Sequence, residues 1–283
     1  MFRHTLLASQ AAAGRLLRRT PLARSTTLNR LNAELALRLS GRSEARLGPY
    51  TVRFDPRDRV IGKHLVLYGS YEPLETAAFL PLIRPGDEVL DVGANIGVYT
   101  LLMAGAVGSG RVIAVEPDPT NLELLRANVA RNRCTNVTVV PCAVGRETRQ
   151  VGLRQDPENR GALSVTQAGC AGTVTVAMRR ARDLLRELRA RPRVMKVDVE
   201  GAEPDVLAGF DELPEVFMFE FTPAQLRGLG HDPLGFLRWV TGRDYALELI
   251  HPATGARIAG TAEQLLASAV ELRRDVNVLA LRR

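Results

Sequence analysis

Short apolar runs alternate with helix-like segments across most of the chain, and this alternation limits the fold more than any other feature. Extended apolar runs occur at residues 88–92, 111–115, 137–141, 193–199 and 215–221. Helical spacing of apolar residues occurs at 97–106, 119–131, 180–190, 202–209 and 232–241. Strands that alternate with helices build a parallel sheet covered on both faces. The sequence therefore predicts an α/β fold.

A glycine-containing loop joins the first of these strands to its helix. The run is Asp91-Val-Gly-Ala-Asn-Ile-Gly97, and it lies where a buried strand ends and a helix begins. Free N–H groups at a helix start, and a turn without side chains, let an anion or a nucleotide approach the backbone. A tight turn with no ligand explains a lone glycine loop about as well.

Three side chains near this loop narrow the choice of ligand. Asn95 stands where a dinucleotide fingerprint needs a middle glycine, so a pyrophosphate is disfavoured. Asp91 places a carboxylate at the strand tip, which suits a cationic amino-acid end. Glu116 follows the next strand, about 20 residues on, where an acid hydrogen-bonds a ribose diol. We therefore predict a nucleoside without phosphates that carries an amino acid, which describes S-adenosylmethionine.

The positive charge of the chain lies in its N-terminal part. The net charge is +7, and residues 1–46 hold nine arginines against two glutamates, which leaves the body neutral. With no basic stripe in the body, we expect no nucleic-acid partner. Residues 1–24 resemble an organellar transit peptide in composition and equally an Arg-rich tail. Residues 28–39 have the spacing of a further helix.

Cysteine content and hydropathy limit where in the cell the protein is expected. Three cysteines without a Cys-x-x-Cys pair make a disulfide framework or a zinc site improbable. No apolar run approaches the roughly 18 residues that span a bilayer. We predict a cytoplasmic protein without stable membrane insertion, and the sequence leaves its oligomeric state open.

The domain organisation is predicted as an Arg-rich extension over residues 1–46 and one domain over 47–283. Alternating apolar residues within 50–68 predict a small hairpin. The helical pattern is interrupted between 144 and 178, where apolar runs at 151–153, 162–165 and 173–177 with Gly-rich turns predict extra strands that form a hairpin insertion. Strands near 245–250 and 276–281 around a helix predict an antiparallel pair that closes the sheet edge.

A second chemical cluster is Lys196-Val-Asp198-Val-Glu200 in the run 193–203. Alternation along an extended strand puts these three charged side chains on one face, near the ligand-binding end of an open sheet. Lys196 is one of only two lysines in a chain that otherwise uses arginine. A buried structural ion pair is the simpler interpretation. Glu220 is expected beside the cluster if its strand is a neighbour.

These motifs together resemble the FkbM family of S-adenosylmethionine-dependent methyltransferases. The resemblance covers roughly residues 69–222 and rests on the two long runs with Tyr71-Glu72, Glu116-Pro-Asp-Pro119, Asn128 and Glu220-Phe221. It implies the class I methyltransferase (Rossmann-like) fold, with a mostly parallel seven-stranded sheet and one reversed strand. It also implies methyl transfer to a hydroxyl of a sugar or a polyketide-like natural product. Arg180-Ala-Arg-Asp183 departs from the family pattern and leaves the role of Asp183 open.

The predicted site divides into cofactor-binding and catalytic residues. The cofactor-binding set is Tyr71, Glu72, Asp91, Gly93, Asn95, Gly97, Glu116, Pro117, Cys142 and Ala143. The catalytic set is Asp198 and Glu200, as candidate bases, with Lys196.

Other polar side chains have weaker roles, and two alternative functions stay open. Asp118 and Asn95 are expected to position the cofactor or the turn, Trp239 to pack, and His64 and His231 to be further possible bases. No metal is expected, because Lys196 would repel a dication. A nicotinamide-dependent oxidoreductase and a non-catalytic small-molecule-binding protein of the same fold remain alternatives.

Overall fold

The computed structural model describes residues 43–58, 60–155, 163–167 and 169–283, which fall into two compact units. The described part of the first unit ends at Tyr71, and the second unit begins at Glu72. Within the described residues, no helix is long and apolar enough to cross a membrane. The predictions for residues 1–42 lie outside this range.

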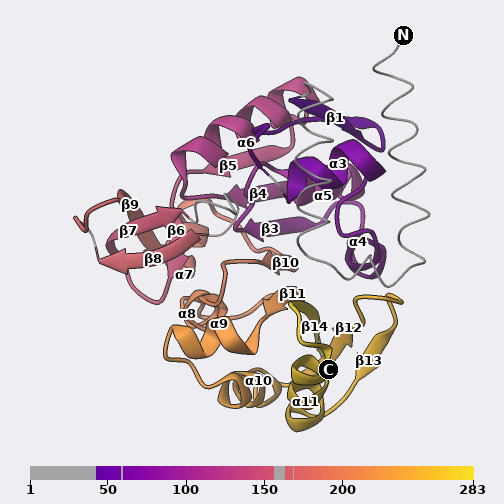
Figure 1. Ribbon diagram of the computed structural model, residues 1–283, viewed down its shortest axis with the longest axis vertical. Helices are drawn as coiled ribbons and strands as arrows, with labels where there is room; N and C mark the ends of the chain where they lie inside the picture. Colours follow the sequence, from indigo (N-terminus) through magenta and orange to yellow (C-terminus); the bar gives the residue numbers. More distant parts are fainter. Residues whose placement is uncertain (1–42, 59, 156–162, 168) are drawn as a thin grey trace. The chain divides into compact units, whose positions relative to one another are not determined.

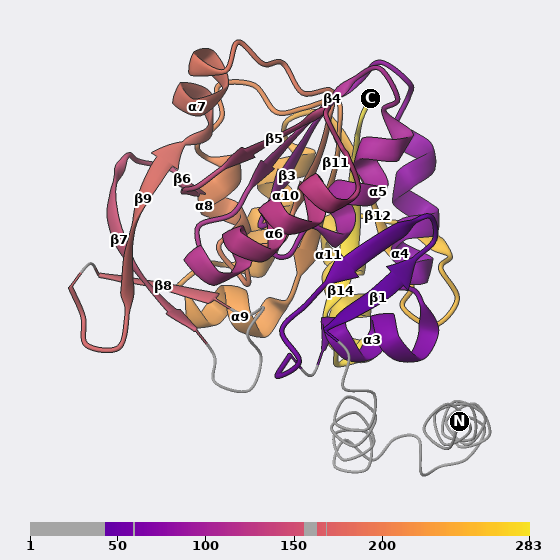
Figure 2. The ribbon, with the colours of Figure 1, turned by 90° about the horizontal axis from the view of Figure 1, so that it is seen from above.

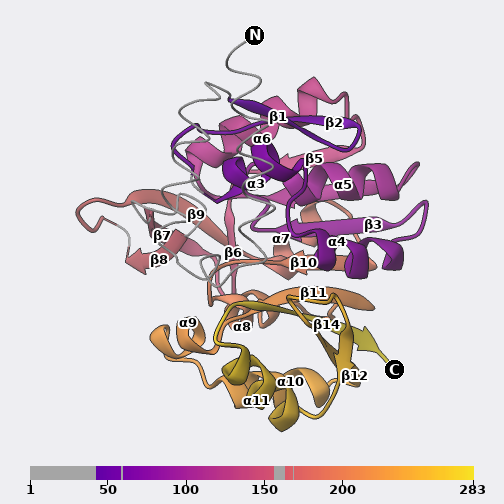
Figure 3. The same ribbon diagram turned by 45° about the vertical axis from the view of Figure 1, so that its right-hand side comes forward.

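The first unit contains a hairpin followed by a helix. Strands β1 (Glu44–Leu47) and β2 (Tyr50–Arg53) pair antiparallel and lie side by side in Figure 3. The predicted hairpin over 50–68 is wrong in its second half, because helix α3 covers Ile61–Tyr68. The Asp58 carboxylate accepts the N–H groups of Val60 and Ile61, and left-handed Gly69 ends the helix. These two local signals outweigh the apolar run.

The second unit is built on an eight-stranded sheet with the order β13-β12-β14-β11-β10-β3-β4-β5 (Figure 1). The strands are β3 (Glu88–Val92), β4 (Arg111–Val115), β5 (Val137–Val140), β10 (Val194–Val197), β11 (Val216–Phe221), β12 (Tyr245–Ile250), β13 (Arg257–Ala259) and β14 (Val276–Arg282). Strands β5, β4, β3, β10 and β11 run parallel, and β14 is reversed between β11 and β12. The class I methyltransferase fold is confirmed, with the short β13 as an additional edge strand.

Helices cover both faces of this sheet. They are α4 (Pro73–Phe79) with the 3-10 turn η2 (Leu80–Leu82), α5 (Val98–Ala106), α6 (Pro119–Arg131), α7 (Ala181–Glu187), α8 (Glu203–Leu207), α9 (Pro223–Gly228), α10 (Pro233–Thr241) and α11 (Ala262–Leu272). Figure 2 shows α6 in front of β3, β4 and β5. The sequence did not predict α9.

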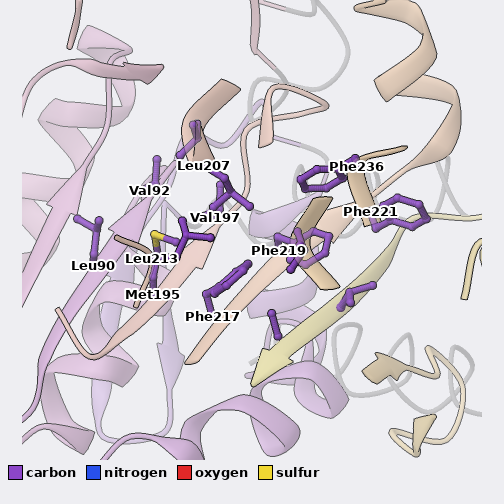
Figure 4. Packing of buried hydrophobic residues seen from close by; sticks show 14 of the residues in the cluster. Leu90, Val92, Met195, Val197, Leu207, Leu213, Phe217, Phe219, Phe221 and Phe236 are labelled. Carbon is purple, nitrogen blue, oxygen red and sulfur yellow. The ribbon is translucent and has the colours of Figure 1, made fainter. Parts of the chain in front are cut away.

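The main apolar core lies on the sheet face that carries the odd-numbered residues of β10 and β11. Phe217, Phe219 and Phe221 point into it from one strand, and Phe236 of α10 meets Phe219 at 5.2 Å between ring centroids (Figure 4). Burying an aromatic ring removes a large apolar area from water. Because alternation sends odd residues into this core, the even residues of the same strands face the opposite side. Lys196 and Glu220 are among those even residues.

The C-terminal strands differ from the prediction in one respect. Strands β12 and β14 form the expected antiparallel pair around α11. The pair does not close the edge, because β14 lies against β11 inside the sheet and β13 follows β12 at the edge. The difference arises from pairing between segments far apart in sequence, which periodicity does not encode.

The region 144–178 forms a sheet of its own. It contains β6 (Ala143–Gly145), β7 (Arg149–Gln155), β8 (Leu163–Gln167) and β9 (Val174–Arg180) in the order β6-β9-β7-β8, and it lies to the left in Figures 1 and 3. The predicted hairpin is β7 with β8. The strand expected at 173–177 is β9, and only β6 was missed, because it has three residues and pairs with β9 at a separation of 35 positions.

Candidate functional site

The carboxyl ends of β3 and β10 bring a carboxylate and an ammonium together. Asp91 and Lys196 are register partners on these parallel strands, and both side chains are buried. Thr100 donates its hydroxyl to Asp91 Oδ2 at 2.6 Å, while Asp91 Oδ1 is buried and has no partner among the described residues. Burial raises the pKa of Asp91, and the nearby Lys196 charge opposes that rise.

Lys196 is the cationic centre of the site. Its Nζ lies 2.8 Å from Asp198 Oδ2 and 4.6 Å from the ring centroid of Tyr99. Burial lowers the pKa of Lys196, but Asp198, Asp91 and Glu72 outweigh it, so the net pKa is raised. The ammonium therefore stays charged at neutral pH. The predicted pairing of Lys196 with Asp198 is present in the structure.

Glu72 joins the cluster through Tyr99. The Tyr99 hydroxyl donates to Glu72 Oε2 at 2.9 Å. Burial raises the pKa of Glu72 to about 7, against the Lys196 charge, which lowers it. Glu72 has a left-handed backbone (φ 44°), as do Asn95 and Glu200 (φ 51° and 57°). Non-glycine residues in this strained region cluster at functional sites.

Glu200 lies close to Asp198 but not on the strand. Strand β10 ends at Val197, so the prediction that alternation aligns Glu200 with Lys196 and Asp198 is wrong for Glu200. A turn carries Glu200 to Gln225 of α9, whose amide donates to Glu200 Oε2 at 2.6 Å. Burial, and then the Asp198 charge, raise the pKa of Glu200 to about 7.

Glu203 and Glu220 add two further carboxyl groups to this cluster. Glu203 is buried and accepts the N–H of Val199 at 3.0 Å, and burial raises its pKa to about 7. Glu220 lies on β11, the neighbour of β10, as expected. Its Oε2 is buried without a partner in the described part of the chain. Burial and then the Asp198 charge raise the pKa of Glu220 well above its ordinary value.

The two loop glycines lie where neighbouring parts of the chain approach the loop closely. A Cβ on Gly93 would lie 1.9 Å from the Asp198 carbonyl oxygen, and one on Gly97 would lie 2.6 Å from Leu125 Cδ1. Both glycines also have positive φ, at 79° and 90°. The idea that their missing side chains let a ligand reach the backbone is therefore not needed to explain them. Gly93 instead lets the loop after β3 contact the turn that carries Asp198.

Glu116 and Asn95 are joined at the tip of β4. The Asn95 N–H donates to Glu116 Oε2 and the Asp118 N–H donates to Oε1, each at 2.8 Å. Burial raises the pKa of Glu116 to about 7. Each carboxylate oxygen keeps a further lone pair for a hydroxyl donor. Asp118 caps α6 by accepting the N–H groups of Thr120 and Asn121, so its side chain has a structural role.

Replacing Glu116 by alanine is expected to weaken cofactor binding by about 1.5–3 kcal/mol, the scale of a charge-assisted hydrogen bond. Calorimetric titration with S-adenosylhomocysteine measures this, and exposed Glu123→Ala on α6 is the control. An analogue without the 2′-hydroxyl should bind weakly to the native chain and lose little more in the variant. Equal losses for both ligands in both proteins would contradict a ribose contact.

The other predicted cofactor residues have less distinctive surroundings. Tyr71 ends the first unit, where its ring lies 6.0 Å from that of His64. Pro117 is half-buried between β4 and α6. Cys142 is buried in the core and Ala143 is buried at the start of β6. Their part in cofactor binding stays a prediction.

The remaining polar side chains that the sequence singled out lie in ordinary contacts. His64 Nδ1 contacts the Val60 carbonyl at 2.8 Å within the first unit. His231 Nε2 lies 3.5 Å from Asp205 Oδ2. Trp239 packs against the core, as predicted, under the Arg243 guanidinium. Asp183 lies in the first turn of α7 beside Arg182.

Sequence reasoning missed three residues that complete the site. Tyr99 and Gln225 orient Glu72 and Glu200, and Glu203 adds a buried carboxyl group. Glu203 already lay inside the 193–203 run that the sequence singled out, but its burial was not predicted. Nothing in the sequence pointed to Gln225, because its contact partner is 25 residues away.

The polar side chains at the strand tips fit S-adenosylmethionine. The described residues contain no group of three or more His, Cys, Asp or Glu side chains that could hold a metal ion. Asp91 Oδ1 is a buried acceptor to which no described residue donates, and a carboxylate oxygen of this kind suits a cationic ligand group. Glu116 has free lone pairs at the next strand tip, where a ribose is expected.

Comparison with known proteins identifies the family. The family model described as "Methyltransferase FkbM domain" matches residues 91–245. Methyltransferase 1 of Beauveria bassiana is 31% identical over 44% of this chain and 58% of its own length.

Two further relatives carry more specific names. The hexuronic acid methyltransferase AglP of Haloferax volcanii is 30% identical over 44% of this chain and 50% of its own length. The 31-O-demethyl-FK506 methyltransferase FkbM of Streptomyces tacrolimicus is 30% identical over 46% of this chain and 62% of its own length. The chain thus spans little more than half the length of the relatives it matches.

The family match covers more than half of this chain and includes the strand tips that carry Asp91, Glu116, Lys196 and Glu220. The match confirms the family that the motifs led us to expect. The chain belongs to the FkbM methyltransferase domain family.

Proposed function

We propose that this chain transfers a methyl group from S-adenosylmethionine to a hydroxyl oxygen of a sugar or a polyketide-like small molecule. The carrying observation is the Lys196–Asp198 ion pair, held at 2.8 Å among further carboxyl groups at the carboxyl edge of the sheet. S-adenosylmethionine supplies an activated methyl group on a sulfonium, so no electrophilic help is required. The residues must therefore align the acceptor and take up its proton.

Asp198 and Glu200 are the candidate bases. Asp198 keeps about 30% of its side chain exposed, so an acceptor hydroxyl can reach it, and its Oδ2 lies 2.8 Å from Lys196 Nζ. Glu200, with a pKa raised to about 7, titrates in the range that suits a general base near neutral pH. Gln225 holds Glu200 in place through its amide.

The names of two relatives support the proposed class of acceptor. One relative's name gives a hexuronic acid as its acceptor. The other's name, 31-O-demethyl, places the missing methyl group on an oxygen. Both names support a hydroxyl acceptor on a small molecule, and we extend that class to this chain. The four-stranded sheet β6–β9 is an insertion within the range that resembles the family, and the C-terminal strands β12 to β14 lie beyond that range. We expect these segments to select the acceptor.

The deciding experiment has two stages. Thermal-shift titration with S-adenosylmethionine, S-adenosylhomocysteine and NAD should show stabilisation by the first two alone. Incubation with labelled S-adenosylmethionine and a panel of hexuronic acids, neutral sugars and macrolide alcohols should then give a methyl ether in mass spectra. Stabilisation by NAD instead would support an oxidoreductase. Cofactor binding without transfer to any oxygen acceptor would contradict O-methylation.

A further inference from the structure

The site carries more carboxyl groups than cations. Lys196 forms an ion pair with Asp198 and faces Asp91 and Glu72. The strongest electrostatic neighbours of Glu220 are all acidic, namely Asp198, Glu200, Glu203 and Asp275. A buried carboxylate among like charges has a high free energy, so at least one group in such a cluster holds a proton.

Among these carboxyl groups, Glu220 has the fewest donors or cations among its described neighbours to stabilise a negative charge. On β11 its cross-strand neighbour is Asn277 of β14, which is neutral. Its Oε2 is buried, and no described residue donates a hydrogen bond to it. By contrast, Glu200 accepts from Gln225, and Glu203 accepts from the backbone. Burial and the four acidic neighbours raise the pKa of Glu220 well above its ordinary value, in agreement with this geometry.

A second observation indicates that a cation completes the cluster. Asp91 Oδ1 is buried, belongs to a fully buried side chain and has no partner in the described part of the chain. Asp91 and Glu220 lie on the same face of the sheet, on strands that flank β10 on either side. A positive ligand charge at this edge would stabilise the ionised form of each carboxyl group.

We propose that Glu220 releases its proton when the cationic cofactor binds and takes up a proton again after methyl transfer. This inference rests on the proposed function. Methyl transfer breaks the carbon–sulfur bond, whose electron pair stays on sulfur, and forms a carbon–oxygen bond from an oxygen lone pair. The acceptor's O–H bond breaks, and its proton passes through Asp198 or Glu200 to the cluster. The charge of the site is then the same before and after turnover.

The sign of the pH dependence follows from linkage. Because binding of the sulfonium releases a proton, the affinity for S-adenosylmethionine rises with pH, by up to about tenfold per pH unit for one full proton. S-adenosylhomocysteine keeps the amino-acid ammonium but lacks the sulfonium charge, so its binding should favour ionisation of Glu220 much less. Its affinity should change much less over the same range. Glu220 is thus a proton-holding residue that distinguishes the charged cofactor from the neutral product.

Proton counting by calorimetry tests the proposal without an acceptor. Each ligand is titrated into the full chain at pH 7 in buffers of different ionisation enthalpy, and the slope gives the protons released per site. We expect roughly 0.3–1 proton for S-adenosylmethionine, since a group cannot release more than it holds, and clearly less for S-adenosylhomocysteine. Binding of both ligands with equal proton release would overturn the inference and leave the proposed function intact. Absence of binding by either would overturn both.

Two variants assign the proton to its group. Glu220→Gln cannot ionise, so release on S-adenosylmethionine binding should fall to less than roughly half of the native value while binding persists. Exposed Glu123→Gln on α6 is the matched control and should keep the native slope. Native proton release in folded Glu220→Gln would overturn the assignment to Glu220. If that variant does not fold, the comparison of the two ligands on the native chain still decides.

Discussion

Lys196→Met is expected to destabilise the protein by about 3–5 kcal/mol, because it leaves buried carboxylates without their cation. Asp198 loses its ion pair at 2.8 Å, and Asp91 and Glu72 lose the charge that opposes their burial. A loss of this size is a large fraction of the usual 5–15 kcal/mol of total stability. Urea unfolding followed by circular dichroism measures it.

The loss should depend on pH with a definite sign. Without the ammonium, the folded pKa of Glu72, already raised to about 7, rises further above its unfolded value. A carboxyl with a raised folded pKa stabilises the fold at low pH and loses that contribution as pH rises through the folded pKa. The variant should therefore be closest to native stability near pH 5 and furthest from it above pH 8.

Two other variants make this prediction specific. Lys63→Met removes the other lysine of the chain, far from this cluster in sequence, and should change stability by less than about 1 kcal/mol. Lys196→Arg keeps the charge and should recover part of the loss, although a guanidinium does not reproduce the ammonium's compact geometry. A Lys196→Met protein as stable as the native one at pH 8 would mean that the carboxyl groups are already neutral.

Asp198→Asn is expected to lower turnover by roughly 10²–10⁴-fold while cofactor affinity stays within a few fold, the effect of removing a general base. Lys196 still faces Asp91 and Glu72 in this variant, so the fold should survive. Glu200→Gln should show a similar loss if the proton passes through that group instead. Single-turnover methyl transfer at saturating cofactor, beside a melting curve for each variant, measures both quantities.

The same measurements separate catalysis from structure. If the Lys196–Asp198 pair only stabilises the fold, Asp198→Asn and Glu200→Gln will melt earlier but keep near-native turnover. Asp211→Asn removes an exposed partner of Arg186 and should alter neither property by much. Normal turnover in both site variants would refute the catalytic assignment of these carboxylates.

Local sequence signals were sufficient for the repeating part of the fold. The strands at 88–92 and 111–115 and the helix at 119–131 match the structure to the residue. Each is a long apolar or periodic run with clear stop signals, such as Asp118 before Pro119 at the start of α6. Such runs bury one continuous face whatever they pack against. Their secondary structure can therefore be predicted without knowledge of the tertiary structure.

Three short segments were not predictable in the same way, because their apolar pattern is too brief or is outweighed by signals at their ends. Residues 61–68 read as a strand but form α3, since Asp58 and Gly69 supply its ends. Strand β13 has three exposed residues and exists only because β12 offers it an edge. Helix α9 has six residues, too short for a periodic pattern.

The candidate site shows the same division. The sequence by itself determined which charged residues lie at the strand ends, namely Asp91, Glu116, Lys196 and Asp198. Their proximity follows from the parallel sheet, whose strands end at the same edge. Only the tertiary structure decided their partners. The turn after Val197 brings Glu200 to Gln225, and α8 adds Glu203. The Asp198 carbonyl oxygen lies in the space that a side chain at position 93 would occupy. Strand order and burial set these contacts, and both arise from pairing across long sequence separations that no local pattern records.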